Sequence, residues 1–194
     1  MGGRLPADLQ NLQDALEAAE RDARALVDGL TEELGAWRVE AGAWSVAECL
    51  DHLATANRVY LAAMRPSAET ARREGRLRCR PAEPGLVGGW FVKYLEPPVK
   101  APLKSKAPRT IRPRTAPPLD DAITHFVAAQ ADVQTFMRVY ADLDLTGVRF
   151  PNPFIRGVRF SLATGLHVIA AHERRHLWQA WRVRRAAERA TQNP

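Results

Sequence analysis

The strongest chemical signal in the sequence is a pair of histidines in the string His172-Glu173-Arg174-Arg175-His176. Residues four positions apart lie one turn apart on the same face of an α-helix, so both imidazoles can reach one ion. Imidazole nitrogens are common ligands of zinc and related divalent metals. The pair therefore predicts a divalent metal site on a helix in this part of the chain.

The same string also matches H-E-x-x-H, in which two histidines bind zinc and the glutamate is the general base of a metalloprotease. Two features argue against a protease. The helical pattern continues through residues 177–181 without a Gly-x-x-His extension, and no segment is a convincing substrate-binding edge strand. Glu173 is then a residue that supports the ligands or a salt-bridged surface glutamate, and the sequence leaves both interpretations open.

A third ligand is expected, and His52 is the natural candidate. It follows Cys49 by three residues and precedes Leu53, and both belong to the apolar stripe of another helical segment. A lone histidine there is more often a hydrogen-bonded core residue, but the pair farther along the chain favours a ligand. The remaining histidines, His125 and His167, fall off these faces, so we expect a surface position for His125 and a boundary or surface position for His167.

Three imidazoles leave one coordination position open, as in catalytic rather than structural zinc sites. Such a site can activate water for attack on a carbonyl, or can bind and activate a thiolate. The sequence does not identify the proton acceptor, because Glu48, Asp51 and Glu173 lie near the ligands with undetermined directions. Gln179, about one turn after His176, either lines the pocket or packs in the core.

Two longer motifs around these histidines resemble those of the DinB-like family. The segment WSVAECLDHL (residues 44–53) is similar to the family's helix-two motif, in which a tryptophan precedes the helix that carries the first metal histidine. The segment HERRHLWQ (residues 172–179) is similar to the motif that carries the other two. The order of the helices and a long connector also fit, so the resemblance covers nearly the whole chain.

The resemblance implies a four-helix bundle with an open metal site formed by His52, His172 and His176, most often occupied by zinc or nickel. It also implies a small-molecule substrate, in some members a low-molecular-weight thiol, and a hydrolase or transferase reaction. A homodimer is the expected assembly. The alternative is a bundle without catalytic activity, which the metal stabilises or which serves as a dimeric binding module.

The rest of the chain supplies the helices that position these residues, and it predicts an all-α four-helix bundle as a single domain over residues 1–194. Apolar residues recur every three or four positions in four segments, about residues 8–30, 45–66, 119–140 and 161–188. A capping box of Ser45 and Glu48 begins the second helix, and Pro66 is expected to end it. The only candidate strand is residues 148–150.

A long Pro-rich, basic insertion separates the second and third helices at residues 66–118, where 10 of the 14 prolines lie. We expect a short helical patch at residues 86–95 that packs on the bundle, and an extended basic run over residues 97–118. A loop of this length inside a domain is usually functional or mobile. Its basic residues can bind an anionic substrate or remain solvated, and the sequence leaves both possibilities open.

The composition excludes several classes of protein. The net charge is +6, but it is concentrated in residues 72–114 rather than on one helix face, so sequence-specific nucleic-acid binding is not expected. The 28 basic residues include only four lysines, a bias typical of GC-rich bacterial genomes. No apolar run reaches the roughly 20 residues of a membrane span, and no secretory signal is evident. Two cysteines, Cys49 and Cys79, make no disulfide framework, so we expect a cytoplasmic protein.

Overall fold

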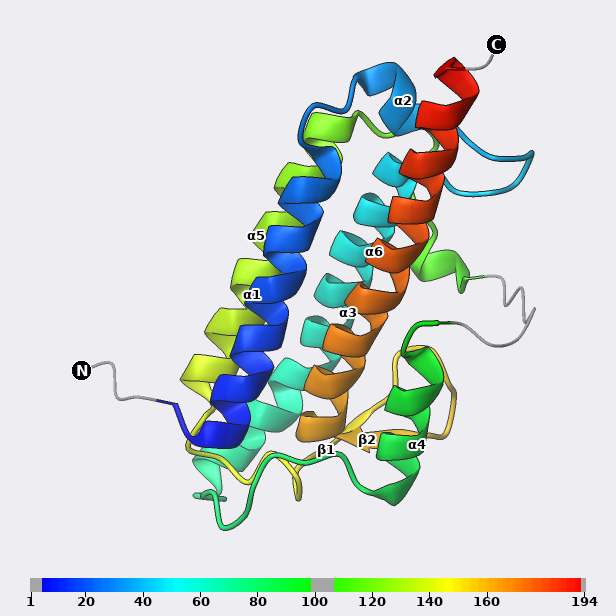
Figure 1. The fold of residues 1–194 in the computed structure, drawn as a ribbon. Coiled ribbons are helices and arrows are strands. Elements are labelled where there is room, and N and C mark those ends of the chain that lie inside the picture. The colour runs from blue at the N-terminus through cyan, green and yellow to red at the C-terminus, as the bar shows by residue number, and fades with distance from the viewer. Residues whose placement is uncertain (1–4, 99–106, 193–194) are drawn as a thin grey trace.

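Four long helices lie side by side and form most of the molecule (Figure 1). They are α1 (Ala7–Val27), α3 (Val46–Arg73), α5 (Leu119–Val139) and α6 (Leu162–Gln192). The structure is a computed structural model that describes residues 5–98 and 107–192. Helices α1 and α3 each pack against both α5 and α6. The chain is mainly helical, as the apolar periodicity predicts.

The buried apolar side chains form two clusters, one toward each end of the long helices. Each long helix contributes residues to both clusters, and the boundary between the clusters lies near the middle of the four helices. Three fully buried polar residues lie at this boundary: Asn57 on α3, Gln130 on α5 and Glu173 on α6. We call these three residues the polar layer. Because buried polar groups are costly unless they are hydrogen-bonded, the layer requires the three helices to meet in one register.

The first turn of α3 is stabilised by the predicted capping box. The backbone N–H of Glu48 donates to the Ser45 hydroxyl at 3.2 Å, and the backbone N–H of Ser45 donates to the Glu48 carboxylate at 3.0 Å. This cap begins the helix close to His52, which lies on its second turn. The local sequence therefore sets the orientation of the first histidine relative to the helix axis.

The expectation that Pro66 ends this helix is wrong, because α3 continues to Arg73. Pro66 lies on the exposed side of the helix, where the carbonyl of Ala62 that loses its intrahelical donor can bond to water. Beyond it, Ala68 and Ala71 are buried against the core. Tertiary packing thus outweighs the missing hydrogen bond, and the connector begins after Arg73.

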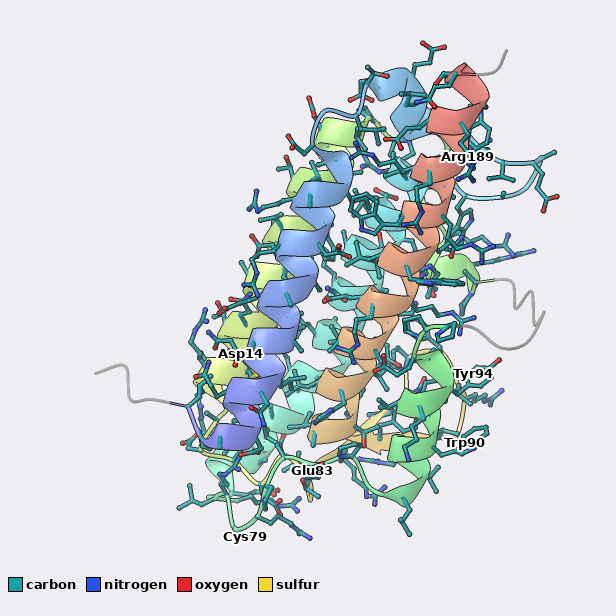
Figure 2. The ribbon with its side chains drawn as sticks, viewed as in Figure 1. Asp14, Cys79, Glu83, Trp90, Tyr94 and Arg189 are labelled. Carbon is teal, nitrogen blue, oxygen red and sulfur yellow. The ribbon has the colours of Figure 1, made fainter. Side chains whose placement is uncertain are left out.

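The connectors contain further short elements. Helix α2 (Glu32–Ala36) was not expected from the sequence, whereas α4 (Leu86–Leu95) confirms the predicted helical patch and packs on α6. Part of the expected extended run over residues 97–118 lies outside the described residues, and the described part includes the 3-10 turn η1 (Arg109–Ile111). Trp90 and Tyr94 project from α4 away from the long helices (Figure 2).

A small antiparallel hairpin covers one end of the helices. Strand β1 (Arg149–Pro151) lies one residue later than the predicted strand, and its partner β2 (Arg159–Ser161) was not predicted. Phe150 and Phe160 are paired across the hairpin and buried beneath it. Among the described residues, the helices are too short or too polar for any of them to cross a bilayer.

Candidate metal centre

The three histidines proposed from the sequence meet between α3 and α6. His52 is buried on α3, and His172 and His176 are half-buried one turn apart on α6. One nitrogen from each ring lies within 4.8 Å of the others, and Nε2 of His52 is 3.2 Å from Nε2 of His172. Two nitrogens bound to one tetrahedral zinc ion lie about 3.3 Å apart. The spacing therefore suits a shared ion.

A backbone carbonyl orients the ring of His52. Its Nδ1 lies 2.6 Å from the carbonyl oxygen of Ile111 in η1. Because a carbonyl oxygen only accepts hydrogen bonds, Nδ1 must carry the proton, and in a neutral ring Nε2 then presents its lone pair to the other two histidines. Such hydrogen bonds to the second ring nitrogen are common features of metal-ligating histidines.

Gln179 orients the ring of His176 in a similar way. The amide oxygen of Gln179 lies 3.0 Å from Nδ1 of His176 and can accept a hydrogen bond from its N–H. Nε2 of His176 then presents its lone pair, like Nε2 of His52. Of the two roles that the sequence left open for Gln179, the structure thus favours contact with the site over simple packing in the core.

The indole ring of Trp44 covers one side of the histidine cluster. Its centroid lies 4.6 Å from that of His52 and 5.5 Å from that of His176. This tryptophan therefore packs directly on two imidazoles. A large apolar ring at this position excludes water from that side of the cluster.

Burial keeps the three imidazoles neutral. It lowers the pKa of His52, lowers the pKa of His172 to about 3, and lowers the pKa of His176 well below its ordinary value. Repulsion among the rings lowers the pKa of His172 and His176 further. A metal must displace any proton from the nitrogen that it binds, so neutral rings are ready ligands near pH 7.

Residues 15–180 match the family model of the DinB superfamily, a range that includes all three histidines. The chain belongs to the DinB superfamily. Neither the curated proteins nor the solved structures contain a match. The family assignment thus agrees with the resemblance of the two histidine motifs.

In this DinB-superfamily chain, Glu173 points away from the histidines and into the polar layer. Its carboxylate accepts hydrogen bonds from the side-chain amides of Asn57 at 2.7 Å and Gln130 at 2.9 Å. Burial raises its pKa to about 7, although both amide donors oppose the change. Glu173 is fully buried, which excludes the surface position that the sequence left open. Both its oxygens are engaged, which argues further against the H-E-x-x-H protease interpretation.

The other two carboxylates near the ligands are also bound. Glu48 accepts two hydrogen bonds from the guanidinium of Arg38, at 2.7 and 2.9 Å. Asp51 accepts one from the side chain and one from the backbone of Arg114, each at 2.8 Å. These ion pairs attach the segments that precede α3 and follow η1 to the first turns of α3. Neither carboxylate is therefore a free proton acceptor.

The remaining histidines do not join the cluster. His125 is half-buried with Nδ1 3.2 Å from a guanidinium nitrogen of Arg114, and His167 is half-buried with Nε2 3.0 Å from the carbonyl oxygen of Ala82. Both occupy boundary positions, which was expected for His167, whereas a surface position was expected for His125.

Proposed function

We propose that this DinB-superfamily protein binds one divalent metal ion through Nε2 of His52, His172 and His176, and uses it in a hydrolase or thiol-transferase reaction. The supporting observation is the convergence of three neutral imidazoles within 4.8 Å. The hydrogen bonds that Nδ1 of His52 and Nδ1 of His176 form direct the lone pair of each Nε2 toward the centre of the cluster. The donor set therefore fits a metal ion.

Three nitrogen ligands suit zinc or nickel better than magnesium or calcium, which prefer oxygen. A bound ion with three protein ligands supplies a Lewis acid with an open position for a small-molecule substrate. Around it, the chain's own residues do the positioning: the Ile111 carbonyl and Gln179 select the histidine tautomers, and Trp44 excludes water from one side.

The engaged carboxylates favour one of the two reactions. Glu48, Asp51 and Glu173 all bind other groups, so none is a ready general base. A nucleophile that is acidic enough to lose its proton to solvent, such as a low-molecular-weight thiol, does not need such a base. We therefore rank thiol transfer ahead of hydrolysis.

The finer features of the fold belong to the same proposal. We interpret the four long helices as a four-helix bundle forming one domain, with the Pro-rich connector at residues 74–118. The pairwise packing of α1 and α3 on both α5 and α6 supports this interpretation. As the resemblance implies, we expect a cytoplasmic homodimer.

Metal analysis of the purified protein tests the site directly. After reloading with zinc or nickel, we expect about one ion per chain in the wild type, and little in His172→Ala. His125→Ala is the matched control, because it removes an imidazole outside the cluster, and it should keep its metal. Undiminished metal in His172→Ala overturns the proposal.

An activity screen then separates an enzyme from a metal-stabilised binding module. The panel contains esters, amides and electrophiles for thiol conjugation, each measured with and without chelator. Turnover that disappears with chelator and returns with metal supports an enzyme. Metal binding without turnover favours the non-catalytic alternative.

A further inference from the structure

The last turns of α3 meet the β1–β2 hairpin at one end of the long helices (Figure 1). An open pocket lies between these elements. Its volume is about 570 Å³, within the range of pockets that bind small molecules. Charged and hydroxyl side chains dominate its lining: Ser67, Thr70, Glu74, Arg76, Arg149 and Arg159. The three arginines come from three segments of chain, so only folding brings them together.

The hairpin presents two of these arginines on one face. Phe150 and Phe160 point into the core, so Arg149 and Arg159, each adjacent to one of them, point outward. A guanidinium nitrogen of Arg159 donates to the backbone carbonyl of Arg149 at 2.9 Å. This bond uses one donor of Arg159 and leaves the others available.

The third arginine reaches the pocket from the segment after α3. A guanidinium nitrogen of Arg76 donates to the carbonyl of Gly147 at 3.3 Å. The charge of Arg76 lowers the pKa of Asp144, but both oxygens of that carboxylate already bond Arg80. Within the described part of the chain, none of the three pocket arginines forms an ion pair. No ion pair therefore neutralises these three guanidinium groups, and the carboxylate of Glu74 lines the same pocket.

We propose that this pocket binds a small molecule carrying a phosphate or diphosphate group. Three arginines less one glutamate give the lining a formal charge of +2, which a dianion neutralises. Guanidinium groups match phosphate oxygens through paired, charge-assisted hydrogen bonds. The hydroxyls of Ser67 and Thr70 add neutral donors to the same space. The concave shape favours a small ligand over an extended polyanion.

This pocket is distinct from the histidine cluster. Ser67 follows His52 by 15 residues on the same helix, which places the two about 22 Å apart along the helix axis. A ligand in the pocket therefore does not touch the metal centre. The inference consequently does not depend on the proposed metal-dependent function.

Inorganic pyrophosphate is the probe for a test by NMR titration of the full-length protein at constant ionic strength. We expect saturable shifts of the backbone amides of Thr70, Arg76 and Gly147, and weaker effects around His52. In the double variant Arg149→Ala/Arg159→Ala, the dissociation constant should rise about tenfold, because charge-assisted hydrogen bonds are lost. Both side chains are exposed, so the fold should tolerate the change.

The control is the double variant Arg182→Ala/Arg189→Ala, which removes the same charge from exposed positions on α6. Arg189 lies toward the other end of the molecule (Figure 2). Its affinity for pyrophosphate should stay within about twofold of the wild type. Equal weakening in both double variants overturns the proposal, because it shows attraction to net charge alone. So does an absence of saturable shifts, a response confined to the histidine cluster, or binding of a single-stranded oligonucleotide without binding of pyrophosphate.

Discussion

The polar layer between the two apolar clusters permits a quantitative prediction. Replacing Glu173 by alanine removes the acceptor of two hydrogen bonds, at 2.7 Å from Asn57 and 2.9 Å from Gln130. Gln130 retains a second acceptor, the carbonyl oxygen of Leu16 at 2.7 Å. The amide nitrogen of Asn57 then has no remaining acceptor among the contacts of the described residues, inside a fully buried site.

The cost follows from two contributions. An unsatisfied buried donor costs about 1–3 kcal/mol, and the cavity left by the truncated side chain adds about 1–2 kcal/mol. We therefore expect Glu173→Ala to lower the free energy of unfolding by about 3 kcal/mol. Glu173→Gln leaves no cavity, and the side-chain oxygens of Asn57 and Gln130, which have no partner among the described residues, can accept from its amide after a flip. Its cost should stay below about 1 kcal/mol.

Urea denaturation of metal-free protein, followed by circular dichroism, measures both variants. At pH 6, below the pKa of about 7, most of the Glu173 carboxyl is protonated, so the cost of a buried charge contributes little. A loss of about 3 kcal/mol corresponds to a fall in Tm of roughly 6–12 °C for a chain of this size. The reasoning is refuted if alanine costs less than about 1 kcal/mol, or if glutamine costs as much as alanine.

Four further perturbations follow from the structure. Ser45→Ala removes the capping box and should cost about 1 kcal/mol in urea denaturation; no change would mean that the cap is dispensable. Gly165→Ala places a methyl 2.9 Å from core atoms and should cost about 1–3 kcal/mol, whereas Gly85→Ala, with nothing within 4 Å, should not. The pKa of Asp144 is lowered, chiefly by an arginine, so its stabilisation holds above the ordinary value of 3.8 and is lost as pH falls below it. Asp144→Asn should therefore lower Tm at pH 7 but flatten its decline in acid, and an unchanged acid profile would contradict this. Zinc should raise the Tm of the wild type and not of His172→Ala, because a ligand stabilises only a state that binds it; equal shifts would place the metal elsewhere.

Local sequence predicted the four long helices, apart from the end of α3, and named the three histidines as candidate ligands. The spacing of His172 and His176 is a property of one helix turn, and the capping box of Ser45 and Glu48 involves only neighbours in the chain. The apolar repeat likewise located α5 almost to the residue. These features could be predicted because the interactions that produce them span only a few residues.

Tertiary structure decided the features that depend on residues far apart in the chain. Pro66 remains inside α3 because the alanines beyond it are buried against the core, which local propensity does not reveal. The carbonyl of Ile111 that orients His52 is 59 residues away in sequence, and the amides that bind Glu173 belong to two other helices. The sequence alone therefore names the candidate ligands, whereas their tautomers, their burial and the direction of the neighbouring carboxylates arise only when separate segments pack together.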